Sequence, residues 1–196
     1  MASSILADIL HGGTLRTHDA LALGIHPRTL YALRDAGLLE TLGRGLYRLA
    51  DLPPLANPDL VTVARKVPRG VVCLISALVF HELTTQVPHI VSLALQRGER
   101  RPRLDFPPLQ VFWFSGAAWS EGIETHQIDE TPVRIYSPAK SVADSFKFRR
   151  QIGMDVALEA LRAYRHSSRF DPQELLRYAR LWRVERILRP YLEALA

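Results

Sequence analysis

The chain has a single cysteine, Cys73, among its 196 residues. One thiol cannot form an internal disulfide or a cysteine-rich zinc site, which favours a reducing cytoplasm. Long apolar runs are also lacking: the longest, residues 71–80, is interrupted by Ser76 and falls far short of the roughly 20 residues that span a bilayer. Met1 to Ser4 carry no basic segment ahead of an apolar one. We therefore expect no signal peptide and no membrane partner.

Charge of one sign is in only slight excess, with 25 basic and 20 acidic residues and a net charge of +5. With 47% apolar and 23% charged residues, the composition is that of a globular protein and excludes disorder. The basic excess favours a nucleic-acid partner. Residues 1–56 hold five basic and five acidic residues, and residues 57–137 hold eight of each. The excess therefore lies in residues 138–196, with twelve basic and seven acidic residues.

Residues 4–50 show the pattern of three short helices followed by a hairpin. Pro27 suits the first position of the third helix, where its missing N–H costs nothing, and Thr17 is the expected cap of the second. Glycines at 43 and 45 provide the positive φ of a tight turn. The expected elements are helices over Ile5–Leu10, Thr17–Leu23 and Pro27 to about Gly37, and strands over Leu39–Leu42 and Leu46–Leu49.

The proline-rich segment Asp51 to Pro58 marks a domain boundary. We expect domains over residues 1–52 and 57–196, the second divided into an α/β part (57–137) and a helical part (138–196). The fold class is α/β (α+β). Strands are predicted at Ile90–Leu95, Gln110–Phe114, Glu124–Ile128 and Val133–Tyr136, and helices at Asp59–Val67, within 71–82 from Ile75, and at Pro138–Arg150, Asp155–Arg165, Pro172–Trp182 and Val184–Leu195.

The spacing of Ala20, Gly24, Leu30 and Leu33 is that of a helix-turn-helix. The first helix needs a small residue where the second crosses it, the turn needs glycine, and the recognition helix needs two apolar residues one turn apart. A following hairpin is typical of the winged variant. The exposed face would then present Arg28, Thr29, Tyr31 and Ala32 to DNA, with Arg44 at the wing tip and Arg48 on its return strand. A helical packing module with surface arginines is the alternative.

The sequence leaves the role of two further basic clusters open. The first is expected either to contact nucleic acid or to lie in a solvated loop, and it consists of Arg97, Arg100, Arg101 and Arg103. In residues 137–150, Val142 and Phe146 are expected to face inward, and Asp144 lies within helical reach of Lys140 and Lys147. The basic residues of this helix would either face an RNA or acidic partner or form an exposed salt-bridged surface. They are Lys140, Lys147, Arg149 and Arg150.

Enzyme motifs are incomplete. His81-Glu82 begins like a zincin helix, but Thr85 stands where the second ligand belongs, and the seven histidines show no ligand spacing. No lysine stands two positions after an acid, as a restriction-type nuclease would require, and P-loop and Gly-x-Ser-x-Gly motifs are absent. The alternating Phe112-Trp113-Phe114 stripe is expected in the core. We therefore predict no catalytic site, no cofactor and no metal.

Two segments resemble a known family. The first runs from His26 to Leu39 and continues through Gly43-Arg44-Gly45-Leu46-Tyr47-Arg48-Leu49, and the second is Val133 to Asp144. Together they look like the winged-helix domain and the strand-to-helix segment of AbiEi-type antitoxins, which belong to type IV (abortive infection) toxin–antitoxin systems. The resemblance extends in order over most of the chain.

The resemblance implies a transcriptional autorepressor that binds repeats in its own promoter, with possible self-association on DNA, and neutralises a nucleotidyltransferase toxin without a stable complex. It implies DNA contacts by Arg28, Thr29, Tyr31, Arg34, Arg44 and Arg48, and an antitoxin face on the segment around Lys140, Asp144 and Lys147, next to Arg149 and Arg150. The alternatives are an ordinary transcriptional regulator whose C-terminal domain senses a ligand or dimerises, and an RNA-binding protein or enzyme that uses the basic C-terminal helices.

Overall fold

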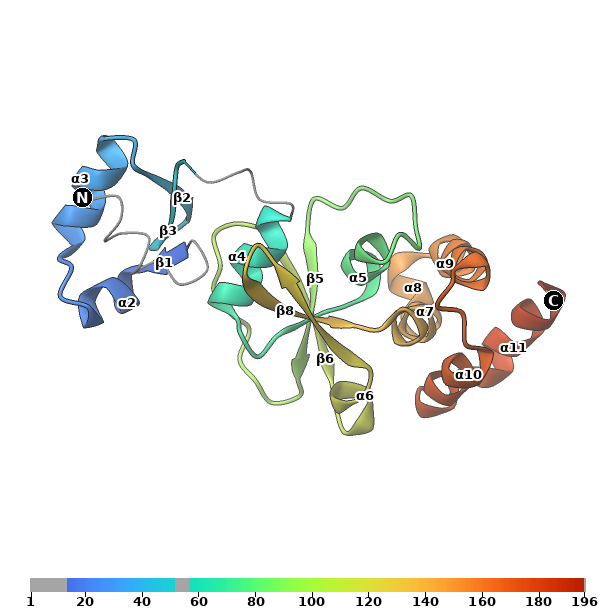
Figure 1. Cartoon of the computed structure of the whole chain (residues 1–196). Coiled ribbons are helices and arrows are strands. Elements are labelled where there is room, and N and C mark those ends of the chain that lie inside the picture. The colour runs from blue at the N-terminus through green and yellow to red at the C-terminus, as the bar shows by residue number, and fades with distance from the viewer. Residues whose placement is uncertain (1–13, 52–56, 196) are drawn as a thin grey trace.

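The computed structural model describes residues 14–51 and 57–195 and combines helices with two sheets (Figure 1). The N-terminal part, residues 14–51, contains β1 (Thr14–Arg16), α2 (Thr17–Ala22), α3 (Pro27–Asp35), β2 (Leu39–Gly43) and β3 (Leu46–Leu49). Its strands form an antiparallel sheet in the order β1-β3-β2. The second and third predicted helices and the hairpin are confirmed. The helix predicted at Ile5–Leu10 lies outside the described residues, and β1 was not predicted.

Local chemistry explains the boundaries of α2 and α3. Pro27 is the first residue of α3, and the His26 side chain caps this helix by accepting a hydrogen bond from the backbone N–H of Arg28. Gly24 has a φ of 78° in the turn between the helices, a conformation that favours glycine. The expected cap of α2 is wrong: the helix begins at Thr17 itself, with Arg16 in the cap position and no side-chain hydrogen bond there.

The C-terminal part, residues 57–195, is built around a five-stranded sheet in the order β6-β5-β4-β8-β7. The strands are β4 (Val71–Val72), β5 (Val91–Gln96), β6 (Leu109–Phe114), β7 (Ile123–Ile128) and β8 (Thr131–Tyr136). β5 is parallel to β6 and β4 is parallel to β8, whereas β4 with β5 and β7 with β8 are antiparallel. The four predicted strands are confirmed, and the central β4 was missed.

Helices cover both faces of this sheet. α4 (Pro58–Lys66) lies on one side in Figure 1, and the C-terminal helices lie on the other. Alternate residues along a strand point to opposite faces, so Val72, Leu93 and Ile135 join the core beneath α4, while Val71 and Tyr136 join the opposite one. Phe112 and Phe114 are buried as predicted, whereas Trp113 is exposed.

The remaining elements are helical. They are α5 (Leu74–Phe80), the unpredicted α6 (Ala117–Ser120), α7 (Pro138–Lys147), α8 (Arg149–Ile152), α9 (Met154–His166), α10 (Pro172–Leu181) and α11 (Glu185–Ala194). Ser137 and Asp171 cap α7 and α10 through their side chains, each just before a proline at the first helical position. Within the described ranges, no helix is long and apolar enough to cross a membrane.

Candidate nucleic-acid interface

The packing of α3 against α2 determines which of its side chains reach solvent. Leu30 and Ala20 are fully buried where the two helices meet, and Leu33 packs against the same cluster. Four predicted contact residues of α3 are exposed in consequence: Arg28, Thr29, Tyr31 and Arg34. Burial of the apolar stripe therefore leaves a polar surface that starts at the N-terminal turn of the helix.

The two arginines of α3 differ in whether an acidic residue pairs with them. Arg34 forms an ion pair with Asp35 at 2.7 Å, and its guanidinium lies 5.3 Å from the centre of the Tyr31 ring. Within residues 14–51 and 57–195, no acid forms an ion pair with Arg28. Arg28 is therefore more available than Arg34 for a phosphate or a base edge.

The wing places its two arginines in different environments. Gly45 adopts a φ of 64° in the hairpin turn, and Arg44 is exposed beside it. Arg48 is only 5% exposed and lies opposite Glu40 across the β2–β3 ladder, with Nη1 2.6 Å from Oε1 of that residue. The expectation that Arg48 faces DNA is therefore corrected, because its guanidinium is used inside the molecule as a cross-strand partner.

The wing tip touches the C-terminal part. The ammonium group of Lys66, the last residue of α4, donates a hydrogen bond to the carbonyl of Arg44. Arg44, Lys66 and Arg103 border a pocket of about 220 Å³ whose other walls are Leu104, Asp105 and Phe106. Burial and the nearby charge of Arg16 lower the pKa of Lys66. Sequence reasoning missed Lys66 because only the fold brings residues 44, 66 and 103 together.

The cluster expected on the surface of α7 lies partly in the core. The side chains of Lys140 and Asp144 are both 0% exposed, and their charged atoms are 2.5 Å apart. The expected exposure of this pair is therefore wrong. α7 packs between α5, α9 and α10, so the side of the helix that carries Lys140 and Asp144 has no access to solvent.

Aromatic rings surround the buried ammonium group. Nζ of Lys140 lies 4.2 Å from the centre of the Tyr136 ring, 4.9 Å from that of Phe114 and 5.2 Å from that of Trp182. The indole N–H of Trp182 donates to the Asp144 carboxylate. Burial raises the pKa of Asp144, while the charge of Lys140 and its hydrogen bond to the carboxylate act to lower it. The pair with its rings is a structural element of the core and cannot meet a partner directly.

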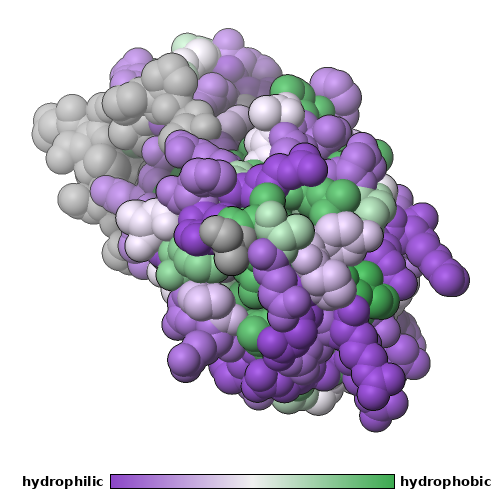
Figure 2. Space-filling model, turned by 90° about the vertical axis from the view of Figure 1, so that its right-hand side faces the viewer, coloured by the Kyte–Doolittle hydropathy of each residue, from purple (hydrophilic) through white to green (hydrophobic). Residues whose placement is uncertain are grey.

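The other residues of this segment stay accessible. Lys147 and Arg150 are exposed, and half-buried Arg149 donates to the carbonyl of Phe146 at 2.7 Å. Figure 2, which views the molecule from the side of the C-terminal helices, shows hydrophilic residues over most of this face with small hydrophobic areas between them. A polar partner surface in this segment is therefore limited to its C-terminal end.

The N-terminal part combines two helices, joined by a turn that contains Gly24, with a following hairpin, which is the arrangement of a helix-turn-helix. Residues 5–50 match the family described as "Transcriptional regulator, AbiEi antitoxin". This match confirms the resemblance of the N-terminal segment; it covers 46 of the 196 residues and does not include the second segment, residues 133–144. No curated protein matches the chain.

Among solved structures, the chain is similar to the RV2827C protein from Mycobacterium tuberculosis. The two are 12% identical, with a TM-score of 0.56 over 98% of this chain and 79% of that one. At this identity the likeness shows the fold alone. It spans the N-terminal and C-terminal parts together, so the mixed α and β architecture is shared along the chain.

Proposed function

We propose that this protein is a cytoplasmic DNA-binding autorepressor and the antitoxin of a type IV toxin–antitoxin operon. Residues 1–52 would form its winged-helix domain, and residues 57–196 the domain that neutralises a nucleotidyltransferase toxin without a stable complex. The observation that carries the proposal is the family match over residues 5–50, on a module whose α3 exposes Arg28 and Thr29.

In the proposed complex the N-terminal turn of α3 enters the major groove. Arg28 and Thr29 then reach base edges or phosphates, and Tyr31 and Arg34 lie further along the same helix. Arg44 contacts the DNA backbone beside the wing, and Lys66 and Arg103 continue the positive surface from the C-terminal part. Two copies on adjacent or inverted half-sites would read the promoter repeats. No enzymatic activity, metal or cofactor is needed for this role.

The DNA-binding half is tested with the full-length protein and a fragment of its own promoter. With about four phosphate contacts per copy, the logarithm of affinity should fall with the logarithm of salt at a slope of about −3.6. Arg28→Ala should weaken binding, whereas Arg186→Ala, an exposed change on α11, should not. Equal binding to promoter and scrambled DNA would refute operator recognition.

The antitoxin half is tested by co-expression with the neighbouring toxin, scored as growth. Lys147, Arg149 and Arg150 are the accessible remainder of the face that the family resemblance indicates. Full-length protein should rescue growth, and a variant with all three replaced by alanine should rescue less, although it folds normally. Rescue by residues 57–196 alone would place neutralisation in that domain, and failure of this fragment, if folded, would refute domain-separated action.

An ordinary regulator with a ligand-sensing C-terminal domain is the second candidate. A pocket of about 300 Å³ between α4, α5 and the segment before β5 favours it, with apolar walls from Leu60, Val79 and Ile90 and a carboxyl group from Asp59. Burial raises the pKa of Asp59. The neighbouring gene separates the candidates: a nucleotidyltransferase reading frame favours the antitoxin, and its absence favours the sensor.

A further inference from the structure

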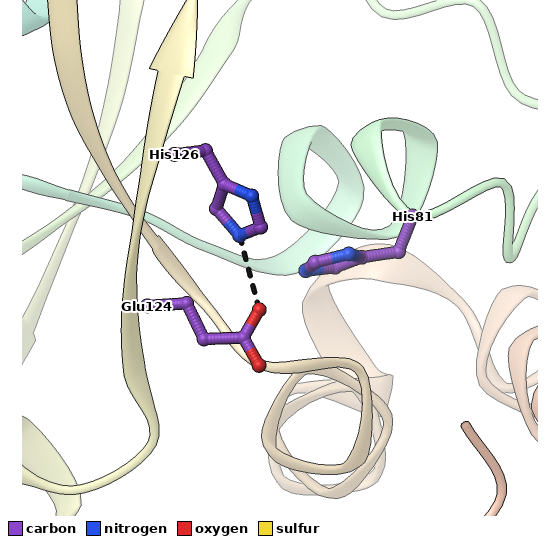
Figure 3. A group of neighbouring side chains, drawn as sticks. All are labelled: His81, Glu124 and His126. Atoms are coloured by element: carbon purple, nitrogen blue, oxygen red, sulfur yellow. Dashed lines mark hydrogen bonds and ion pairs between the residues drawn. The ribbon is translucent and has the colours of Figure 1, made fainter.

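Three potential metal ligands meet beside the outer strand of the large sheet. His81 is the residue at the C-terminal end of α5, and Glu124 and His126 are alternate residues of β7, so both of the latter project from one face of the strand. One ligand atom from each residue lies within 4.8 Å of the other two. Figure 3 shows the three side chains converging on one space from the helix end and the strand.

The surroundings of this cluster suit a cation with a solvent ligand. The side chains of Glu124 and His126 are 26% and 29% exposed, so the site is open on one side. The Phe80 ring packs edge-on against both imidazoles, with centroid distances of 5.2 Å to His81 and 4.8 Å to His126. The last carbonyls of α5 add negative potential next to His81. An apolar wall on one side and an opening on the other resemble the layout of a three-ligand metal site.

The ligand types and distances identify the metal class. Two imidazoles and one carboxylate bind Zn²⁺ and related divalent transition ions. With Zn–N and Zn–O bonds of about 2.0–2.2 Å, neighbouring ligands of a tetrahedral ion lie about 3.3 Å apart. Nε2 of His126 is already 3.0 Å from Oε2 of Glu124. We propose that His81, Glu124 and His126 form a binding site for one Zn²⁺-class ion, which links the end of α5 to β7.

Without the metal, other groups hold the three ligands in place. The guanidinium of Arg169 pairs with both carboxylate oxygens of Glu124, and Nε2 of His81 lies 2.8 Å from the carbonyl oxygen of Tyr136. An incoming cation therefore competes with Arg169 for Glu124. This competition gives the proposal a distinctive consequence, because removal of the Arg169 charge should strengthen metal binding instead of weakening it.

The test uses full-length protein freed of metal by chelator. Zn²⁺ is titrated against a chromophoric competitor, and Co²⁺ is titrated while its visible absorption is recorded. We expect one ion per chain and a tetrahedral or five-coordinate Co²⁺ spectrum. His81→Ala, His126→Ala and the nearly isosteric Glu124→Gln should each lower affinity at least about tenfold, and Arg169→Gln should raise it. His166→Ala is the matched control, since its exposed ring bonds only to its own helix.

Circular dichroism of every variant shows whether a lower metal affinity results from the loss of a coordinating side chain or from unfolding. If an alanine variant unfolds, Glu124→Gln and Arg169→Gln still test the site, because the first is nearly isosteric and the second replaces a side chain that is 51% exposed. The absence of stoichiometric binding to the wild type would overturn the proposal, as would equal affinity after replacement of both histidines. The inference does not depend on the proposed DNA-binding function, since neither DNA nor toxin enters the measurement.

Discussion

The N-terminal and C-terminal parts use positive charge in opposite ways. Residues 1–56 are neutral by count, yet Arg28 and Arg44 are exposed with no ion-pair partner in the described parts of the chain. Residues 138–196 carry the entire basic excess, yet Lys140 is fully buried, and Arg177, Arg180 and Arg189 are paired with glutamates. The number of basic residues in a segment is thus a poor guide to the charge available to a partner.

The largest expected effect comes from breaking the buried pair. Lys140→Ala leaves Asp144 as an uncompensated charge in the core, and loss of one partner of a buried pair costs about 3–5 kcal/mol. Chemical denaturation should therefore show a large fall in the free energy of unfolding. Lys147→Ala, on the same helix but exposed, should change it by less than about 0.5 kcal/mol. A double Lys140→Met, Asp144→Leu variant should recover most of the loss.

Arg28→Ala should give the next largest effect, this time on DNA binding. A direct base or phosphate contact at the start of a recognition helix is worth about 1–3 kcal/mol. Fluorescence anisotropy with promoter DNA should show that loss while the melting temperature stays unchanged. If the variant binds as tightly as the wild type, Arg28 does not contact DNA. The exposed charge of the N-terminal part would then not explain DNA binding.

Arg44→Ala and Arg103→Ala should have smaller effects that depend on salt. Each removes one proposed phosphate contact, so each should reduce the salt slope of operator binding by about one unit. Arg97→Ala is the matched control for Arg103, because it is an exposed arginine near the start of the same loop. An unchanged slope in Arg103→Ala would confine the interface to the N-terminal part.

The smallest effect concerns Cys73. Burial raises the pKa of its thiol, and the side chain has no access to solvent. A thiol reagent should therefore label the native protein very slowly and the unfolded protein at the rate of an ordinary cysteine. Because Cys73 lies near the Lys140–Asp144 pair, Lys140→Ala should speed labelling. Rapid labelling of the native wild type would contradict the packing of this core.

Most helices and strands follow from periodicity and caps, because those signals are local. β4 and α6 escaped prediction since two to four residues are too short to show a period. The burial of Lys140 was not predicted because a lysine four residues from an aspartate is typical of an exposed helix face. Ala139, Ser141, Ala143 and Ser145 alternate small side chains along α7, a pattern that fits close packing on several sides and would have indicated burial.

The candidate sites were easier to predict where their residues lie close together in the sequence. The face of α3 follows from residues one turn apart, so all four DNA contacts predicted on this helix are exposed as expected. Arg48 was misplaced because its cross-strand neighbour Glu40 fixes it, and pairing register is not visible in the spacing alone. The cluster of His81 with Glu124 and His126 depends on a contact across more than forty residues. Only the Glu-x-His alternation within β7 gave a local hint.

The short β4 has a consequence for how the large sheet opens. Ladder contacts between the β5–β6 pair and the β7–β8 pair pass through Val71 and Val72, which face Ala94 and Leu93 on one side and Ile135 on the other. These two residues therefore connect the β5–β6 pair to the β7–β8 pair. Their amide protons should exchange last with deuterated solvent, and once they open, the sheet separates into halves instead of fraying strand by strand.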